Sequence, residues 1–210
     1  MDKSEKFWDR QAGSFTNHGQ GVQLADNRDF KSILNFLDIN DKVLDYGCAT
    51  GIISNAIADK AKEIHAIDIS SKMIEIAKMK AREHNIENIN YAHATIFDER
   101  FQEESFNMVL AFRVLHMLED PRAVIRRINQ LLKPDGVFIS VTACMASLKA
   151  LFSIPVFLLG KTGIVPEHIN FFKLPELQGL MTGEGFQIVE CEKMDDKVPH
   201  YCFVARKLQR

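Results

Sequence analysis

Short apolar runs alternate with amphipathic stretches along most of this chain, and that alternation limits the possible folds more than any other feature. The apolar runs have the length and composition of buried strands. Most of the stretches between them have helical periodicity. The runs are Val43 to Tyr46, Ile64 to Asp68, residues 89–93, residues 106–112 and Val137 to Thr142. Alternation at this spacing indicates βαβ units, in which helices cover both faces of a mostly parallel sheet.

The last part of the chain has a different pattern. Phe186 to Met194 and His200 to Lys207 have the composition of two strands, and only Asp195 to Pro199 lie between them. Since so short a gap cannot hold a crossover helix, the two strands should pair as an antiparallel hairpin. The sequence thus predicts an α/β fold: a doubly wound, mostly parallel seven-stranded sheet with an antiparallel C-terminal hairpin and helices on both faces. No linker or repeat is visible, and we expect a single domain over residues 1–210.

Local signals place several of the predicted helices. Ser71 is expected to cap a helix that carries Met73 and Ala77 on its apolar face. Asp120 suits the N-cap of a later helix, with Pro121 in its first position. Residues 51–61 predict another helix, and a fourth is predicted by an apolar series at helical spacing: Phe30, Ile33, Leu34 and Leu37.

Composition narrows the classes of partner. The chain has 26 basic and 28 acidic residues, a net charge of −2, and no basic stripe, which argues against a nucleic-acid partner. The four cysteines are far apart and form no CxxC pair, so we expect neither a disulfide framework nor a metal site, and a reducing compartment. The longest uncharged apolar run, Ala150 to Gly160, is too short to cross a bilayer, and no secretory signal begins the chain. These features predict a cytoplasmic protein with no stable membrane insertion.

The turn after the first predicted strand has the sequence Asp45-Tyr46-Gly47-Cys48-Ala49-Thr50-Gly51. A glycine-containing turn between a strand and a helix gathers backbone N–H groups and the helix dipole at the carboxyl edge of the sheet. Asp68 ends the next strand, where a carboxylate can accept hydrogen bonds from both hydroxyls of a ribose. Together these residues predict a nucleoside-containing cofactor that lies across the first two strands.

Two common nucleotide-binding patterns are missing from the sequence. The dinucleotide pattern GxGxxG would need glycines at positions 47, 49 and 52, but Ala49 and Ile52 stand at two of them. A phosphate-binding loop of the form GxxxxGK followed by Ser or Thr does not occur. Asp45 would also place negative charge beside a pyrophosphate, so it suits a cation or an amine better.

The segment Val43 to Gly51 resembles the first motif of the seven-strand, Rossmann-like (class I) methyltransferases, which use S-adenosylmethionine. Phe7 to Ala12 resembles the helix that these enzymes fold over the cofactor. The resemblance implies an S-adenosylmethionine-dependent methyltransferase of the small-molecule type. Over about residues 43–143 the likeness continues in order through Ile67 to Ser70 with Met73, Ser105 to Val109, Val114 to Pro121, and Leu131 to Gly136.

The same resemblance implies a set of residues that bind the cofactor. Asp45 would lie near its ammonium group and Asp68 would hold the ribose hydroxyls, while Ile69 and Met73 would pack against the adenine. The full set comprises Asp45, Gly47, Cys48, Ala49, Gly51, Asp68, Ile69, Met73, His93, Ala94, Thr95, Phe112 and Arg113.

Two positions depart from the family's pattern. His93 stands where an acidic residue often accepts the adenine amino group. A neutral imidazole can still accept one hydrogen bond there, and Asp98 is the alternative if the alignment slips. Asn107 replaces the usual acid of the Ser-Phe-Asp segment, and we interpret it as structural.

The methyl acceptor is less sharply specified. His116 and His168 are the candidate catalytic residues, although His116 could instead order its loop and His168 could stabilise a turn. The segment Met145 to Phe172 is unusually apolar, and residues 145–172 should form a lid, a dimer interface or extra core. With a cofactor-covering segment at about residues 1–25, this insert favours a small, apolar or aromatic acceptor and leaves a homodimer possible.

Two alternative functions stay open at this point. A non-catalytic S-adenosylmethionine-binding protein would keep the same turn and the same strand-end carboxylates. A nicotinamide-dependent oxidoreductase would use a similar sheet, but the missing third glycine and the C-terminal hairpin count against it.

Overall fold

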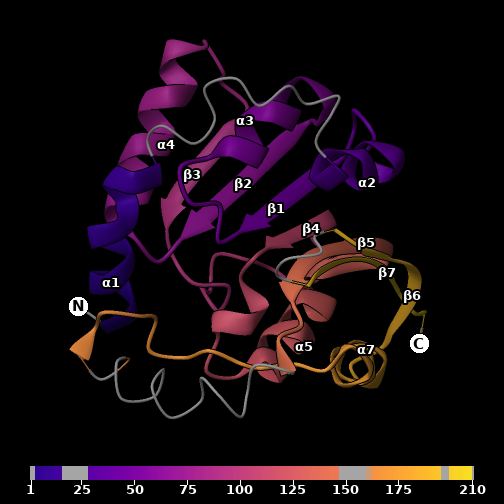
Figure 1. The fold of residues 1–210 in the computed structure, drawn as a ribbon. Coiled ribbons are helices and arrows are strands. Elements are labelled where there is room, and N and C mark those ends of the chain that lie inside the picture. Colours follow the sequence, from indigo (N-terminus) through magenta and orange to yellow (C-terminus); the bar gives the residue numbers. More distant parts are fainter. Residues whose placement is uncertain (1–2, 16–27, 147–159, 161, 195–198, 210) are drawn as a thin grey trace.

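A single seven-stranded sheet runs through the centre of the molecule. The computed structural model describes residues 3–15, 28–146, 160, 162–194 and 199–209 (Figure 1). The strands follow the order β3-β2-β1-β4-β5-β7-β6 across the sheet. Their bounds are β1 (Lys42–Tyr46), β2 (Glu63–Asp68), β3 (Ile89–His93), β4 (Phe106–Phe112), β5 (Leu132–Ala143), β6 (Phe186–Lys193) and β7 (His200–Lys207).

The strand directions confirm the predicted fold class. Strands β1 to β5 pair in parallel, whereas β7 pairs antiparallel with both β5 and β6. The C-terminal hairpin therefore adds to the edge of the parallel sheet with β7 on the inside. Strand β5 begins at Leu132 and not at Val137 as predicted, because Leu132 already pairs with Phe106. A register shift between Leu132 and Val137 takes up the Pro134-Asp135-Gly136 turn.

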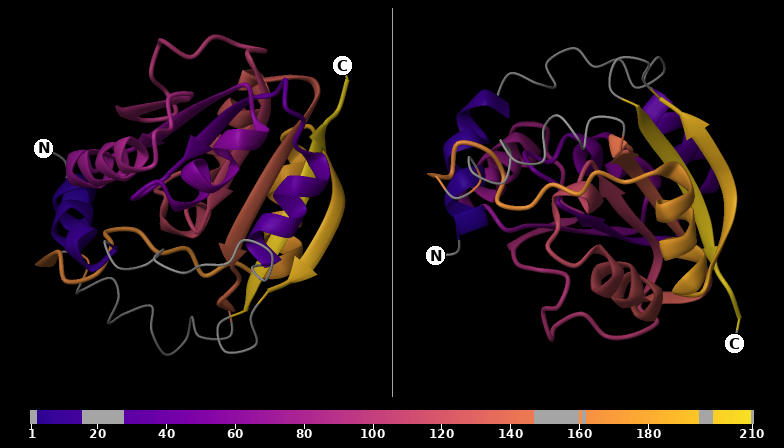
Figure 2. Two further views of the ribbon diagram at one scale, coloured as in Figure 1. Left: turned by 90° about the horizontal axis from the view of Figure 1, so that it is seen from above. Right: turned by 60° about the horizontal axis from the view of Figure 1, so that its bottom comes forward.

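Helices cover both faces of the sheet, as the alternating pattern predicts (Figure 2). The helices are α1 (Lys3–Gln11), α2 (Arg28–Phe36), α3 (Ile52–Ile57), α4 (Ser71–Glu83), α5 (Pro121–Leu131) and α7 (Leu174–Gly183), with 3-10 turns η1 (Ala12–Phe15), η3 (Ala58–Lys60) and η4 (Leu115–Met117). One face packs β1, β2 and β4 against α5 and α7 around Leu44, Ile128 and Leu177. The other packs the sheet against α2, α3 and α4 around Ile33, Ile57 and Ala77.

The helix ends agree with the predictions in part. The Asp120 side chain accepts a hydrogen bond from the Ala123 N–H and Pro121 opens α5, as predicted. The predicted cap at Ser71 is wrong by one residue: the Ser70 hydroxyl accepts from the Met73 N–H, and Ser71 is the first helical residue. Sequence could not separate these two serines, because either can reach the first turn of a helix.

The early helical segments are shorter than their apolar patterns suggest. Phe30 and Ile33 of α2 are buried, but Leu34 is 40% exposed and Leu37 follows the end of the helix. Residues 51–61 form α3 and then the separate turn η3. The predicted N-terminal covering segment (1–25) and insert (145–172) are described only at residues 3–15, 145–146, 160 and 162–172. Among the helices of the described ranges, none has both the length and the apolar character needed to span a bilayer.

Candidate functional site

The turn after β1 lies where the sheet changes its direction of winding. From β1 the chain continues outward to β2 and β3 on one side, and it returns through β4 to β5 on the other. Connections that leave in opposite directions open a crevice at the carboxyl ends of these strands, which is where doubly wound folds bind ligands. The predicted set therefore meets at the edge expected for a cofactor.

Backbone conformation explains the two glycines of the turn. Gly47 has a φ of +74° and Gly51 a φ of +75°, in the left-handed region that L side chains rarely adopt. A Cβ on Gly47 would collide with Cγ2 of Val114, and one on Gly51 would collide with the Tyr91 hydroxyl. The N–H groups of Gly47 and Cys48 both donate to the carbonyl oxygen of Ile67, at 2.8 and 3.0 Å. The turn is thereby fixed against β2.

Asp68 joins the turn to the start of α4. Its Oδ2 accepts from the Ala49 N–H at 3.0 Å, and its Oδ1 accepts from the Ser70 N–H at 2.8 Å. Burial raises the pKa of this carboxyl, while these two backbone hydrogen bonds oppose the rise. Each carboxylate oxygen has a second lone pair, so the pair can still accept hydrogen bonds from a vicinal diol. Asp68 thus has the chemistry predicted for a ribose ligand.

Asp45 lies beneath the turn and is 1% exposed. The Ser54 hydroxyl donates to its Oδ2 at 2.5 Å. Burial raises its pKa to about 6, and the charge of Asp68 adds to the rise. A cation placed beside this buried carboxyl would stabilise its ionised form. Asp45 therefore has the charge and the acceptor oxygens that the ammonium group of S-adenosylmethionine requires. The Cys48 thiol is buried beside these carboxylates, and its pKa lies well above the usual value because of burial first and their charges second.

His93 has other partners than the predicted adenine. Its Nε2 lies 2.9 Å from the carbonyl oxygen of Ile69, to which it must donate, and 3.4 Å from Oε1 of Glu5. The ring therefore ties the end of β3 to the β2–α4 loop and to α1. The neighbouring Ile69 is half-buried and Met73 is buried, so packing of an adenine against them stays a prediction.

Helix α1 packs on the start of α4 and reaches the segment before α7 (Figure 1). The buried Asp9 accepts at Oδ1 from the Ser70 hydroxyl at 2.6 Å and from the Lys72 N–H at 3.3 Å. On the other side, Nη2 of Arg10 donates to the carbonyl oxygen of Gly163 at 2.6 Å. Helix α1 thus joins the start of α4 to residue 163.

The chain that leaves β4 forms the other wall of the site. Phe112 is buried, and Arg113 has a φ of +60° while its N–H donates to the carbonyl oxygen of Val141 at 2.7 Å. Val114 then packs against Gly47. Hence Phe112 and Arg113 follow the strand that pairs with β1, next to the turn, whereas Ala94 and Thr95 follow β3 on the far side of β2.

The two candidate catalytic histidines differ in environment. His116, in η4, is 4% exposed, and its carbonyl oxygen accepts from the Asn170 N–H at 2.7 Å. Burial lowers the pKa of its imidazole to about 4, with smaller contributions from His200 and Arg113. His168 is half-buried two residues before Asn170, and its side chain makes no hydrogen bond within the described part of the chain. The structure joins both histidines to one wall but shows no contact between their side chains.

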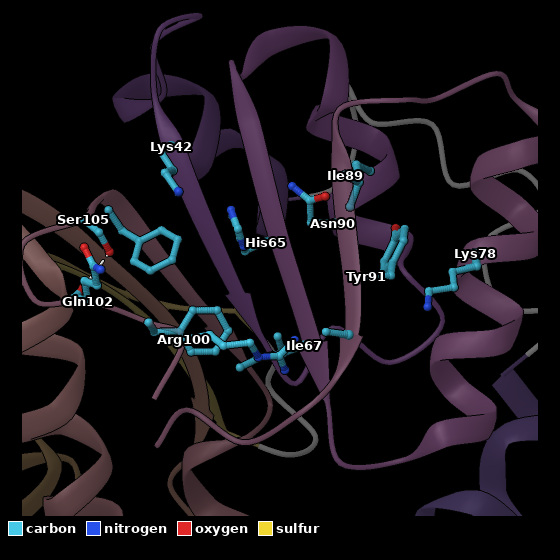
Figure 3. A pocket seen from close by; sticks show the side chains of 13 residues that line it. Lys42, His65, Ile67, Lys78, Ile89, Asn90, Tyr91, Arg100, Gln102 and Ser105 are labelled. Carbon is cyan, nitrogen blue, oxygen red and sulfur yellow. Dashed lines mark hydrogen bonds between the residues drawn. The ribbon is translucent and has the colours of Figure 1, made fainter. Parts of the chain in front are cut away.

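A cavity of about 640 Å³ lies along β1 to β3 (Figure 3). Lys42, His65 and Asn90 line it, and all three interact with the Glu63 carboxylate, at 3.5, 2.7 and 2.9 Å. None of the predicted cofactor residues lines this cavity. In the described ranges no group of three or more His, Cys, Asp or Glu side chains could hold a metal ion.

Sequence reasoning missed the residues that support the site from a distance. Ser54, Asp9 and Asn170 each hydrogen-bond a group in or beside the predicted set. Asp9 and Ser70 are 61 positions apart, and no local pattern links them. Only Ser54 carried a signal: a small polar residue in the helix that follows the turn, close enough to reach the end of β1.

Residues 37–159 match a family model described as a methyltransferase domain. The chain is 39% identical over 101 residues to the ubiquinone biosynthesis O-methyltransferase of Haemophilus ducreyi. That alignment covers 46% of this chain and 42% of the relative, so the match spans less than half of the relative's length.

Two solved structures show how widely the fold is used. N-methyltransferase NodS from Bradyrhizobium japonicum, in complex with S-adenosyl-L-homocysteine, is similar with a TM-score of 0.71 at 19% identity, over 99% of this chain and 100% of NodS. The [4+2]-cyclase SpnF is similar with a TM-score of 0.69 at 16% identity, over 86% of this chain and 80% of SpnF. At such identities the likeness establishes the fold alone.

Proposed function

The chain belongs to the methyltransferase-domain family, and on that premise we propose that it transfers a methyl group from S-adenosylmethionine to a hydroxyl group of a small, apolar or aromatic acceptor. The observation that carries the proposal is the turn after β1. Its two glycines have positive φ angles and no room for a Cβ, and they lie between the buried Asp45 and the strand-end Asp68. The hydroxyl acceptor is supported by the relative's name, which describes an O-methyltransferase.

Each part of the predicted set would hold a different part of the cofactor. Asp68 would accept hydrogen bonds from the ribose hydroxyls, and Asp45 would balance the ammonium charge. The backbone of Gly47, Cys48 and Gly51 would approach the methionine portion. The adenine would lie among the residues that end β3 and begin α4: Ile69, Met73, His93, Ala94 and Thr95.

When bound, S-adenosylmethionine supplies a methyl group activated by its sulfonium centre. The chain's own residues then have to align and enclose the reactants, and orientation of this kind can lower a barrier by roughly 7–11 kcal/mol. Val114 packs against Gly47 and so joins the acceptor wall to the cofactor turn. Helix α1 closes the same edge from the side of α4 through Asp9. Because the cofactor supplies the activated methyl group and the protein supplies only alignment and enclosure, no dense cluster of catalytic side chains is needed.

A thermal-shift experiment tests the cofactor. S-adenosylhomocysteine at 100 times its dissociation constant should stabilise the protein by about 2.7 kcal/mol, and NAD should not. Asp68→Ala should remove most of this shift, whereas Asp59→Ala, at an exposed acid of η3, should keep it. A shift with NAD alone would favour the oxidoreductase.

Turnover needs its own measurement. We expect release of S-adenosylhomocysteine when S-adenosylmethionine is mixed with simple phenols, and no release with their methyl ethers. Tight binding of S-adenosylhomocysteine without turnover on any hydroxyl, amine or thiol acceptor would instead support a non-catalytic binding protein. We include a cytoplasmic location in the proposal, because a small apolar acceptor and S-adenosylmethionine must meet in the compartment where the cofactor is made.

A further inference from the structure

One buried polar atom in the described part of the chain has no hydrogen-bond partner: Nδ1 of His116. The residue is 4% exposed. Leaving such an atom unsatisfied costs free energy, and native proteins rarely tolerate it without a reason. The unsatisfied nitrogen therefore indicates a hydrogen-bonding partner that arrives with a bound ligand.

The position of His116 in the fold indicates which ligand could supply this partner. Val114, two residues earlier, touches Gly47 of the cofactor turn. The His116 backbone is held by Asn170, and its ring lies 6.3 Å from the ring of His200 at an angle of 80°. His200 pairs with Ala143 at the carboxyl end of β5. Consequently Nδ1 is buried at the same sheet edge as the cofactor turn, on the acceptor side.

The chemistry of a neutral imidazole selects the group. Burial, His200 and Arg113 hold the pKa of His116 at about 4, so the ring is uncharged near neutral pH. An uncharged ring has one N–H and one lone pair, and either can be at Nδ1. A hydroxyl both donates and accepts, so it satisfies Nδ1 in either form, whereas an ether or a carboxylate only accepts and an ammonium only donates.

We propose that Nδ1 of His116 binds the hydroxyl group of the methyl acceptor, which makes His116 the residue that selects a neutral hydroxyl compound and orients its oxygen. This inference rests on the proposed function. Methylation replaces the hydroxyl hydrogen by a methyl group, and the resulting ether has no donor. With the proton on Nε2 and the lone pair on Nδ1, the ring can accept from the hydroxyl but not from the ether, so His116 also weakens the binding of the product relative to the substrate.

Binding to protein saturated with S-adenosylhomocysteine tests the proposal without turnover. Two matched pairs serve as probes: 4-propylphenol with 4-propylanisole, and 2-naphthol with 2-methoxynaphthalene. By isothermal titration calorimetry the wild-type protein should bind each phenol at least about tenfold more tightly than its ether. The Nδ1 signal of ¹⁵N-labelled His116 should shift with the phenols only.

Three variants locate the preference. His116→Phe should bring the phenol-to-ether ratio to about one, and His116→Gln, whose amide can donate and accept, should keep part of it. His84→Gln, at an exposed histidine at the end of α4, should leave the ratio unchanged. If His116→Phe fails to fold, His116→Leu replaces it in the same comparison.

The outcomes separate this inference from the proposed function. Absence of S-adenosylhomocysteine binding contradicts the proposed function itself. If that ligand binds but the wild-type protein shows no phenol preference, or if the preference survives in the Phe or Leu variant, the role of His116 is refuted.

Discussion

At the scale of single residues, two carboxylates at neighbouring strand ends have separate tasks. Asp68 is held by two backbone N–H groups, one from the turn and one from the start of α4. Asp45 lies deeper and has the Ser54 hydroxyl as its partner. Under the proposed function, the first would accept further hydrogen bonds, while the second would meet a positive charge.

Asp45 should make ligand affinity depend on pH. Its pKa is about 6 in the free protein, and a bound ammonium group would lower it by favouring the ionised form. Binding then releases a proton below pH 6, so affinity should be constant above about pH 6 and weaken by up to tenfold per pH unit below it.

Calorimetry with S-adenosylhomocysteine from pH 5 to pH 8 measures this dependence. Asp45→Asn should bind more weakly above pH 6, and its affinity should vary less with pH. If the affinity of Asp45→Asn varied with pH in the same way as that of the wild type, the pH dependence would belong to another group.

Gly47 gives a second prediction at this scale. Gly47→Ala should lose about 2 kcal/mol or more of stability, because alanine is strained at a φ of +74° and its Cβ collides with Val114. Affinity for S-adenosylhomocysteine should fall as the turn shifts. Denaturant unfolding and calorimetry measure the two effects.

Gly179 is the matched control for this substitution. It lies in α7, and a Cβ added at this position would meet no other atom within 4 Å. Gly179→Ala should therefore stabilise the protein by about 0.5–1 kcal/mol and leave ligand affinity unchanged. Equal effects at both positions would show that the turn has no special need for glycine.

At the scale of elements, local signals predicted most of the sheet. Strands β3 and β4 have the predicted bounds, and the α5 cap at Asp120 is the predicted one, because periodicity and capping depend on neighbours in sequence. Contacts between distant segments were not predictable in this way. The Asp9 contact with Ser70, the early start of β5 and the cavity along β1 to β3 depend on tertiary packing that no local pattern encodes.

The contact between α1 and α4 gives a prediction for the element scale. Asp9→Ala removes an acceptor for the Ser70 hydroxyl and the Lys72 N–H at the start of α4. By analogy with the loss of an N-cap we expect about 1 kcal/mol less stability, together with faster proteolysis near residues 3–15.

Lys6, an exposed residue of α1, is the control for this element. Lys6→Ala should leave both stability and proteolysis close to those of the wild type. A similar loss in the two variants would mean that the effect follows any change of side chain in α1 and is not specific to the Asp9 contact.

At the scale of the whole molecule, α1 links two parts of the site that are far apart in sequence. It contacts α4 through Asp9 and residue 163 through Arg10. We expect S-adenosylhomocysteine to slow amide hydrogen exchange in residues 3–15 and 162–172 as well as in the turn and in α4. Mass spectrometry of peptic fragments measures this. Slower exchange confined to residues 45–51 and 68–73 would show that α1 does not couple the two regions.

The ends of the sheet bear on self-association. Strand β6 forms one edge, and it combines exposed Glu190, Glu192 and Lys193 with a register shift beside Ile188. Charges and irregular pairing of this kind discourage edge-to-edge contact between sheets. The charged, irregular edge of β6 is therefore unfavourable for pairing with the sheet of a second copy.

The two backbone hydrogen bonds to Asp68 also have a kinetic consequence. They hold the turn and the start of α4 together within the protein itself, so under the proposed function the carboxylate that would bind the ribose is in place before a nucleoside arrives and after one leaves. Little ordering entropy is then lost on binding, and ligand exchange need not wait for the turn to refold. The rate of repeated turnover would be set by access to this edge, and the protein could alternate quickly between fresh donor and spent product.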